Sequence, residues 1–364
     1  MRITRVAGLF GAVTVGLGFA GPVGLIQDLG TLGGGNATAY AINGLGQAAG
    51  WSTTSTGGTQ AFLSGSGAVS GLSTSVTGAD SYAFGINGSG VVTGTYYVDG
   101  QGHGAIWNGS TVTDLGANTY GQAINDAGAV VGGNGQAFLY SGGSMQMLGY
   151  LPGGNWSAAY GINDLGEVVG YGTIAPGVFR AFYWNGSVMV PLGTLGGGTS
   201  YAMGVNDAGA IVGGSATGNG YMNAFLYRGR SMNGLGTLGG TTSYAYGVND
   251  NGYVVGYSTT ADGSSHAFVY MNGTMIDLNS VLGVNSGWDL LDAYAINGNN
   301  QIAGTGLYGG EEHAFVLSLP RPLLADPPAA PSMVPEATTS ILTFSGVCVI
   351  GLMQLFRRRR AAAR

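Results

Sequence analysis

The stretch YGINDLGEVVG at residues 160–170 decides the fold, because its pattern recurs along the whole body of the chain. The pattern is an Asn, a Gly three residues later and a second Gly seven residues later. Successive copies lie 38 to 48 residues apart. The seven copies begin at Asn43, Asn87, Asn125, Asn163, Asn206, Asn249 and Asn297. Self-similarity at such a period indicates a solenoid, a propeller or another repeat array.

Two further patterns follow each of these Asn residues. The first is Ala-Phe-Leu-Tyr or a close variant, and the second is Leu-Gly, as in Asp114-Leu115-Gly116. The first pattern begins at Ala61, Ala105, Ala137, Ala181, Ala224, Ala267 and Ala314. We interpret the segment before the Asn, the Val-Val-Gly segment, the Ala-Phe segment and the Leu-Gly segment as four successive strands. Asn-x-x-Gly is then a turn in which the Gly has a positive φ. In the seventh copy Asn300 replaces this Gly, which fits the prediction because Asn tolerates a positive φ better than other non-Gly residues do.

Four strands in about 43 residues make one propeller blade, so we predict an all-β, seven-bladed β-propeller. The first repeat opens with a fourth-strand segment at residues 25–32, and the last repeat ends on a third strand at residues 313–317. The N-terminal strand should therefore complete blade seven, and closure would remove the exposed sheet edges. An open β-solenoid is the main alternative. Small residues two positions before each Asn suit a crowded axis, and Asn185-Gly186 and Asn272-Gly273 suit type I′ hairpins.

The composition excludes one class of partner. The chain has 364 residues, of which 73 are Gly and only 8% are charged, yet 45% are hydrophobic. Residues 21–335 hold 16 acidic residues and 4 Arg, a net charge of 4 − 16 = −12. Since nucleic-acid binding needs a basic face, we expect no nucleic-acid partner.

The termini indicate export. Residues 1–20 read as a signal peptide, with Arg2 and Arg5 before an apolar stretch, and would engage the export machinery; a buried N-terminal helix is the alternative. Residues 338–356 carry no charge and would form a transmembrane helix of about 28 Å. The domains are then a signal peptide (1–20), a propeller (21–319), a Pro-rich linker (320–335) and a tail (336–364). The basic cluster that follows the helix belongs on the cytoplasmic side, and consists of Arg357, Arg358, Arg359 and Arg360.

Two parts of the chain resemble known families. The tail resembles the PEP-CTERM sorting signal of Gram-negative bacteria, on Val334-Pro335-Glu336, the apolar helix and the Arg cluster, although Ala337 stands where the motif has a second Pro. That resemblance implies an exosortase-type partner and a body that is released or attached elsewhere; a permanent anchor is the alternative. The body resembles the HAF repeats of probable extracellular bacterial proteins, on His266-Ala267-Phe268, Ile162-Asn163-Asp164 and Asp28-Leu29-Gly30. This second resemblance implies location and architecture, and no reaction.

The sequence shows no recognised catalytic set and predicts no cofactor or metal. It has no His-Glu-x-x-His, no Cys pair and no Gly-x-Ser-x-Gly. We expect His103, His266 and His313 to be exposed strand-edge residues on separate blades. The Asp residues that follow several of the repeat Asn residues should act within their own turns.

Binding is the function that the pattern favours. The turns after the first and third strands lie on one face of the ring, here called the tight-turn face, with both chain ends. Long variable loops lie on the opposite, loop face, where binding residues are commonly found. Exposed aromatic residues of these loops would stack on sugar rings of an extracellular polysaccharide, and the candidates are Tyr96, Tyr97, Trp156, Phe179, Tyr221 and Trp288. Packing of these residues against neighbouring loops is the alternative.

Two other functions stay open. The chain could be a lyase or hydrolase that uses a close carboxylate pair, Asp289 with Asp292 or Glu311 with Glu312, if two such groups face one another across a pocket. It could also be a purely structural repeat.

Overall fold

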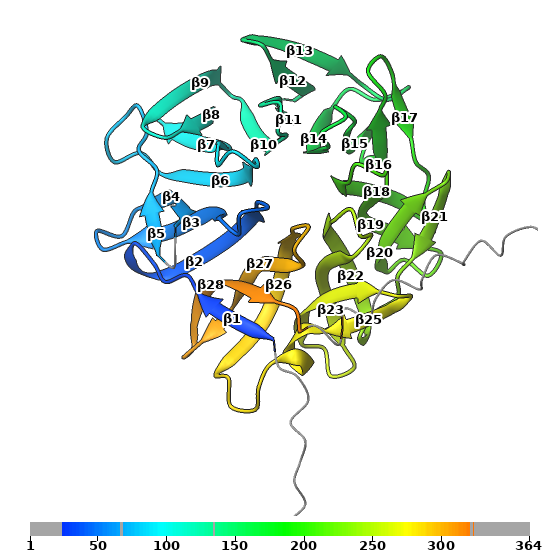
Figure 1. The fold of residues 1–364 in the computed structure, drawn as a ribbon. Coiled ribbons are helices and arrows are strands. Elements are labelled where there is room, and N and C mark those ends of the chain that lie inside the picture. Colours follow the sequence, from blue (N-terminus) through cyan, green and yellow to red (C-terminus); the bar gives the residue numbers. More distant parts are fainter. Residues whose placement is uncertain (1–23, 66–67, 134, 321–322, 324–364) are drawn as a thin grey trace, which may run out of the picture. The chain divides into compact units, whose positions relative to one another are not determined.

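The computed structural model describes residues 24–65, 68–133, 135–320 and 323, and these residues form a ring of seven four-stranded antiparallel sheets (Figure 1). The predicted seven-bladed propeller is therefore confirmed, and the solenoid is excluded. The predicted signal peptide, membrane helix, sorting motif and Arg cluster lie outside the described residues. Within the described part, no helix has the length and apolarity needed to cross a membrane.

Each blade follows the predicted order of strands, from the innermost to the outermost. Blade one comprises β2 (Gly33–Ile42), β3 (Ala48–Thr54), β4 (Thr59–Ser64) and β5 (Val69–Gly71). Blade two comprises β6 (Ser81–Ile86), β7 (Val92–Val98), β8 (Gln101–Asn108) and β9 (Thr111–Ala117). Blade three comprises β10 (Tyr120–Ile124), β11 (Val130–Gly133), β12 (Ala137–Ser141) and β13 (Ser144–Gly149). Blade four comprises β14 (Ser157–Ile162), β15 (Val168–Ala175), β16 (Val178–Trp184) and β17 (Met189–Pro191). Blade five comprises β18 (Gly196–Val205), β19 (Ile211–Thr217), β20 (Met222–Arg228) and β21 (Ser231–Gly234). Blade six comprises β22 (Gly239–Val248), β23 (Val254–Thr260), β24 (Ser265–Met271) and β25 (Thr274–Asp277). Blade seven comprises β26 (Trp288–Ile296), β27 (Gln301–Tyr308), β28 (Glu311–Ser318) and, as its outermost strand, β1 (Leu25–Asp28). A short 3-10 helix, η1 (Leu278–Val281), follows β25.

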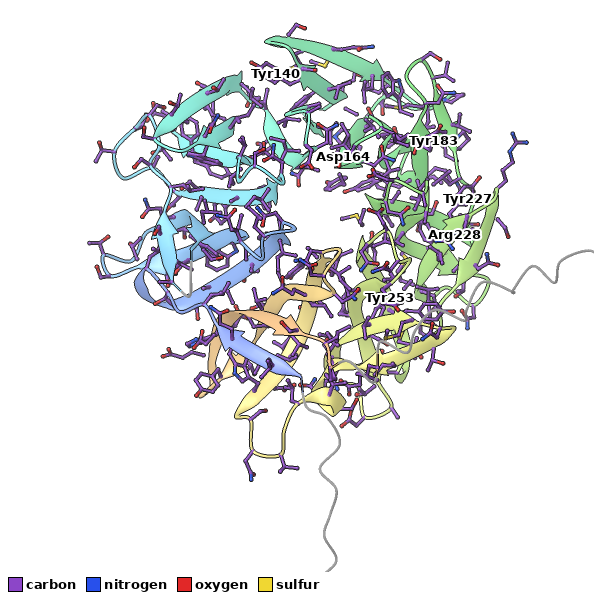
Figure 2. All side chains as sticks on the ribbon, in the orientation of Figure 1. Tyr140, Asp164, Tyr183, Tyr227, Arg228 and Tyr253 are labelled. Atoms are coloured by element: carbon purple, nitrogen blue, oxygen red, sulfur yellow. The ribbon has the colours of Figure 1, made fainter. Side chains whose placement is uncertain are left out.

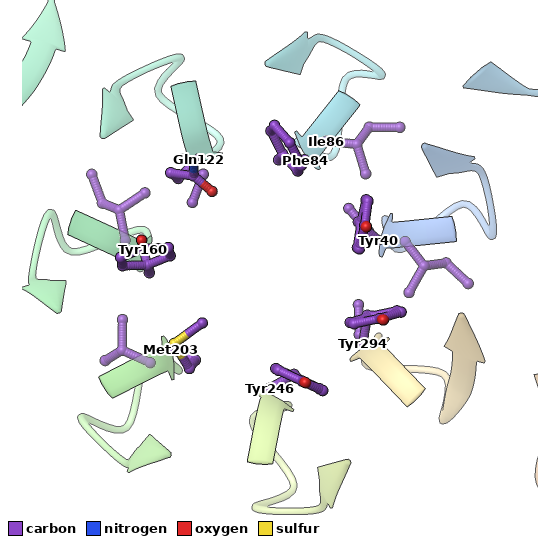
Figure 3. A pocket seen from close by; sticks show the side chains of 18 of the residues that line it. Tyr40, Phe84, Ile86, Gln122, Tyr160, Met203, Tyr246 and Tyr294 are labelled. Atoms are coloured by element: carbon purple, nitrogen blue, oxygen red, sulfur yellow. The ribbon is translucent and has the colours of Figure 1, made fainter. Parts of the chain in front are cut away.

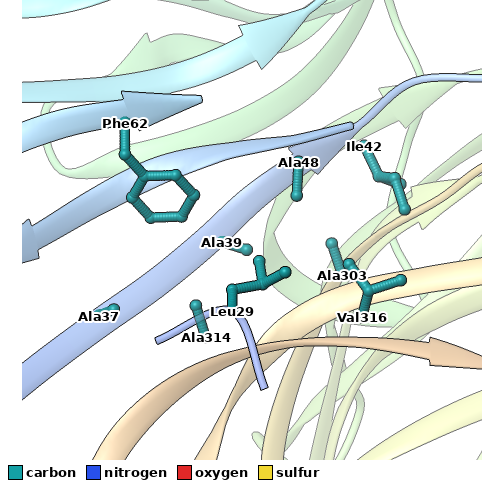
Figure 4. Packing of buried hydrophobic residues seen from close by; sticks show 9 residues of the cluster. All are labelled: Leu29, Ala37, Ala39, Ile42, Ala48, Phe62, Ala303, Ala314 and Val316. Carbon is teal, nitrogen blue, oxygen red and sulfur yellow. The ribbon is translucent and has the colours of Figure 1, made fainter. Parts of the chain in front are cut away.

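The N-terminal strand closes the ring as predicted. β1 pairs antiparallel with β28, with Leu25 opposite Ser318 and Asp28 opposite Phe315. Because Leu25 and Ser318 are partners, both ends of the propeller lie together on the tight-turn face. The seam between blades seven and one is packed with apolar side chains from both blades, including Leu29, Phe62 and Ala314 (Figure 4).

The Ala-Phe pattern is the core contact between blades. All six Phe residues of the pattern are fully buried, and blade two departs with a buried Trp107. The Phe of one blade clusters with the Ala of the preceding blade, as Phe182 does with Ala137 and Phe268 does with Ala224. A small residue in each third strand therefore leaves room for the ring of the next blade, which repeats the same packing around the propeller.

The repeat Asn residues join the blades as well as the turns. Each Asn side chain is buried, and its Nδ2 donates to the backbone carbonyl of the corresponding Asn in the next blade, at 2.8 to 3.3 Å. The last of these bonds runs from Asn297 to Asn43 and completes a closed ring of seven, here called the Asn ring. Each Oδ1 accepts from the backbone N–H four residues later, as at Ala210. The sequence predicted only the turn contribution.

The turn prediction itself is confirmed. The third residue after each Asn has a positive φ, for example 81° at Gly166, and Asn300 adopts 59° in the seventh copy. The Asn272-Gly273 turn has positive φ at both residues, as a type I′ hairpin requires. The Asn185-Gly186 prediction was wrong, because only Gly186 has a positive φ. Asn185 instead accepts hydrogen bonds from the N–H groups of Ser187 and Val188 through its own side chain.

One expectation about the loops was also wrong. The loop face was expected to carry long variable loops, but most of its connections between the second and third strands are short turns, such as the one in which the Thr54 N–H donates to the Gly58 carbonyl. The longer segments of the loop face instead connect one blade to the next, as residues 72–80 and 278–287 do.

Candidate functional site: an aromatic channel

The innermost strand of every blade carries a β-bulge at the same place. The register shifts between the residues four and two positions before the repeat Asn in all seven blades. The residue between them is extra, and a bulge of this kind redirects a side chain. The seven bulge residues project into the central channel (Figure 3), and five of them are aromatic. They are Tyr40, Phe84, Gln122, Tyr160, Met203, Tyr246 and Tyr294.

The bulge explains the second Gly of the repeat. In every blade the carbonyl oxygen five residues before the Asn points at this Gly of the second strand. A Cβ on the Gly would lie only 1.8 to 2.1 Å from that oxygen, as it would at Gly170 beside Ala158. Gly is therefore required sterically at this position. The small residues two before each Asn are also confirmed as packing contacts, because a Cβ on Gly204 would meet the carbonyl of Tyr246 at 2.8 Å.

The channel has an apolar interior with a cavity of about 480 Å³. The bulge residues line one end of it and the residues directly before the Asn ring line the other end, mostly Ile. Beyond this aliphatic ring, the tight-turn mouth is a separate hollow of about 320 Å³, lined by the Asn ring and the residues that follow it. The first volume lies in the range of small-ligand pockets, and its lining is mainly apolar and aromatic, as such pockets require.

Further tyrosines extend the aromatic lining toward the loop face. Tyr160 stacks on Tyr171 at 5.0 Å, and their hydroxyl oxygens are 3.0 Å apart. Tyr171 contacts Tyr201 edge-on at 4.8 Å, and Tyr244 stacks on Tyr257. These rings are half-buried, and burial raises the pKa of Tyr171 and of Tyr244. On the other side of the channel, Tyr82 stacks on Phe84 at 6.4 Å and Trp51 lies edge-on to Tyr82 at 6.0 Å. We call the channel aromatics together with Trp51, Tyr82, Tyr171, Tyr201, Tyr244 and Tyr257 the aromatic basin.

One half-buried carboxylate lies next to the basin. Asp292 lies in β26, two residues before Tyr294, and burial raises its pKa to about 6, with a smaller contribution from the negative charge of Glu312 in β28. The same carboxylate adds to the effect of burial in raising the pKa of Tyr246 and of Tyr294. These two carboxylates come from different strands. They are not one of the two pairs of sequence neighbours, Asp289 with Asp292 and Glu311 with Glu312, that the sequence suggested. We call Asp292 and Glu312 the acidic corner.

The six predicted binding aromatics are not brought together. Tyr96 is buried inside β7 at 1% exposure and accepts a hydrogen bond from Ser75, so its expected loop position was wrong. Tyr97 also belongs to β7, and Phe179 to β16. Trp156 and Phe179 contact each other and Tyr171, at the edge of the basin. Tyr221 is exposed on a turn of blade five, and Trp288 stacks on Tyr308 in blade seven.

The histidines are paired, which corrects the expectation of exposed edge residues. Each Nδ1 lies near the Asp of the following fourth strand: His103 at 3.1 Å from Asp114, His266 at 2.7 Å from Asp277 and His313 at 3.0 Å from Asp28. All three His side chains are less than a quarter exposed. The three pairs occupy blades two, six and seven, so they do not form one site.

The Asp residues of the tight turns also differ from expectation. Their carboxylates accept backbone N–H bonds from the preceding blade rather than acting in their own turns. Asp126, for example, accepts from Gly88 at 2.6 Å, and Asp164 accepts from Asp126 at 2.7 Å. Asp164 lies beside the central opening (Figure 2). These carboxylates reinforce the Asn ring from blade to blade.

Comparison with known proteins supports the architecture alone. No protein-family model matches the chain, and no curated protein matches it in sequence. Among solved structures, YCF48 bound to a D1 peptide has a TM-score of 0.50 and 12% identity, over 81% of this chain and 96% of that one. The WD40 β-propeller domain of Doa1 has a TM-score of 0.48 and 15% identity, over 80% and 97%. A gluconolactonase from Xanthomonas campestris has a TM-score of 0.40 and 13% identity, over 67% and 91%. The functions in these names differ, so the shared fold leaves the function to be argued from the site.

Proposed function

We propose that this chain is an exported, non-enzymatic repeat protein of the bacterial cell surface or extracellular matrix that binds polysaccharide through the aromatic basin. The observation that carries the proposal is the set of five aromatic side chains that the bulges project into one channel. Aromatic rings give large contact areas with little conformational entropy to lose, and tyrosine adds a hydroxyl for hydrogen bonding. Both features suit the apolar faces and hydroxyl groups of sugar rings.

The location is inferred from the sequence. The signal-like residues 1–20, the apolar residues 338–356 and the Arg cluster support export, with an exosortase-type enzyme as a processing partner and the membrane as the alternative anchor. Since both ends of the propeller lie on the tight-turn face, a tether at either end would leave the loop face and its basin pointing away from the membrane.

The test is a glycan array probed with the purified full chain, followed by titration calorimetry on the glycans that bind. Tyr294→Ala should weaken binding by about five- to 150-fold, because stacking on an aromatic side chain is worth about 1–3 kcal/mol where it has been measured for nucleic-acid bases. Tyr150→Ala is the matched control, since Tyr150 is an exposed tyrosine outside the channel lining. Equal losses in the two variants, or no binding to any glycan, would reject the basin as a saccharide site.

A second function is favoured by the acidic corner. A carboxyl group whose pKa is about 6 can act as a general acid near neutral pH, and Glu312 could serve as its partner in a hydrolase or lyase. Incubating bound glycans with the full chain and measuring new reducing ends decides this. Turnover that Asp292→Asn abolishes would replace the binding proposal with an enzymatic one.

A further inference from the structure

Asp292 carries a negative charge that nothing in the described part of the molecule compensates. No hydrogen-bond donor contributes to its pKa, which is governed by burial and by Glu312. The ion pairs among the described residues join His side chains to Asp28, Asp114, Asp277 and Asp289 only. A half-buried carboxylate without a donor or a cation is costly in a folded protein, and such groups gather at functional sites.

The described Arg residues lie in other blades, and His313 of blade seven is paired with Asp28. Arg180 belongs to β16 of blade four, while Arg228 ends β20 of blade five and approaches Gly252 in a tight turn of blade six. Arg230 follows in the turn after β20. The acidic corner in blade seven therefore has a second carboxylate as its nearest charged influence and tyrosines around it.

Tyrosine rings of three neighbouring blades contact one another around Tyr294, which lies two residues after Asp292 in β26. Tyr294 lies edge-on to Tyr40 at 4.7 Å and near Tyr246 at 4.9 Å, and Tyr246 lies 6.0 Å from Tyr257. Figure 3 shows Tyr40, Tyr246 and Tyr294 projecting into the channel from three neighbouring blades. The charge of Asp292 raises the pKa of all four tyrosines, which places them within its electrostatic reach.

A carboxylate beside several aromatic faces is the arrangement that binds an organic ammonium group. The ring faces attract a cation through their quadrupoles, and the carboxylate supplies an ion pair in a region of low dielectric constant. Neutral sugars need only the rings. A ligand that brings a positive charge would also give the carboxylate a partner.

We propose that the acidic corner recognises a protonated amine carried on a sugar ring, so that the ligand class is a polysaccharide with free amino groups, such as glucosamine residues without their acetyl groups. This inference rests on the proposed saccharide-binding function and narrows it. The ammonium group lies against Asp292 with Glu312 adding negative potential, while the sugar ring contacts Tyr294 and Tyr246. Acetylation would remove the charge and leave the carboxylate without a partner.

The test is titration calorimetry of the full chain at pH 7 with two oligosaccharides that differ only in their amino groups, a glucosamine hexamer and an N-acetylglucosamine hexamer. The free-amine hexamer should bind at least about tenfold more tightly, since one desolvated charge interaction is worth about that factor. Asp292→Asn should abolish the preference, Glu312→Gln should reduce it, and Asp99→Asn, an exposed carboxylate on a turn of blade two, should leave it unchanged. The thermal unfolding of each variant is recorded to establish that it is folded.

The outcomes separate the two proposals. Equal binding of both hexamers, or a preference that survives in a folded Asp292→Asn variant, overturns the ammonium inference while saccharide binding stands. If neither hexamer binds, and the glycan array is also negative, both proposals fail. Binding of hexylamine alone, with the same dependence on Asp292 and no saccharide binding, supports ammonium recognition and rejects the saccharide.

Discussion

The side-chain amide of Asn297 donates a 2.9 Å hydrogen bond to the backbone carbonyl of Asn43, a residue 254 positions earlier in the chain. This bond completes the Asn ring and joins the last blade to the first at the tight-turn mouth. A second contact holds the N-terminal strand inside blade seven, where His313 of β28 lies 3.0 Å from Asp28 of β1. Closure therefore depends on hydrogen bonds that recur in every blade and on one pair specific to the N-terminal strand.

Replacing one amide of the Asn ring should destabilise the whole propeller. In Asn206→Asp, the carboxylate cannot donate to Asn249 at 2.8 Å, and it places a charge in a buried position. We expect the free energy of unfolding to fall by roughly 2–3 kcal/mol, measured by urea denaturation. Asn108→Asp makes the same chemical change at an exposed position and should have little effect. A similar small effect in both variants would show that the Asn ring contributes little.

The Gly beside each bulge should not tolerate a side chain. In Gly170→Ala the new Cβ would meet the carbonyl oxygen of Ala158 at about 2.1 Å, so the bulge or the second strand must move. We expect a loss of about 3 kcal/mol or more, seen as a lower thermal midpoint. The control is Gly198→Ala, where a Cβ meets nothing within 4 Å. Unchanged stability of Gly170→Ala would refute the steric account of the repeat.

The acidic corner should lower stability in a pH-dependent way. The pKa of Asp292 is raised from 3.8 to about 6 on folding, so the group favours the folded state below pH 3.8 and loses that contribution as pH rises through 6. Asp292→Asn should therefore be more stable than the wild type by up to about 3 kcal/mol at pH 8 and equal to it near pH 3.5. Glu312 adds negative charge near this carboxylate. The pKa values of the nearby tyrosines Tyr40, Tyr246, Tyr257 and Tyr294 are raised above the usual value of 10, so these side chains stay neutral over this pH range.

Urea denaturation at the two pH values measures the difference, and Asp99→Asn is the control. A variant that is less stable than the wild type at pH 8 would show that Asp292 has a structural partner and would remove the main argument for a ligand. Substitution of a functional residue often makes a protein more stable, because binding sites are commonly less stable than the rest of the fold.

The pair of His313 and Asp28 should hold the N-terminal strand in place. Asp28 accepts from Gly30 and contacts His313, so Asp28→Asn weakens the attachment of β1 to β28. Amide hydrogen exchange of β1 should become about tenfold faster, which corresponds to about 1.4 kcal/mol of local opening. Asp114→Asn breaks the equivalent pair within blade two and should accelerate β9 while leaving β1 unchanged. Equal exchange in β1 for both variants would contradict the role of the pair.

Much of the fold could be predicted from the sequence because the repeat is regular. The Asn-x-x-Gly turn, its replacement by Asn300 and the closure by β1 all followed from local turn chemistry and the order of strands. The long-range bonds of the Asn ring could not be predicted, because a turn already accounted for the Asn. The error at Asn185 has a similar origin, since the sequence does not reveal that its side chain caps the turn.

The site was harder to predict because it depends on a bulge. From an alternating strand pattern alone, one would not predict that the residue three positions before each Asn points into the channel. The candidates were instead sought in loops, where binding residues are common, and one of them, Tyr96, is buried in a strand. A signal was present, since five of these seven residues are Tyr or Phe. The His pairs had a signal too, because the three blades with a His in the third strand are those with an Asp before the Leu of the fourth.

The most direct test of the account is to determine the structure of the full chain with the glycan that binds it most tightly. We predict density for sugar rings at the loop-face end of the channel, against Tyr40, Tyr246 and Tyr294, with an amino group next to Asp292. A glycan bound at the rim of the blades or in the tight-turn mouth, with the channel unchanged, would contradict the assignment of the aromatic basin as the binding site.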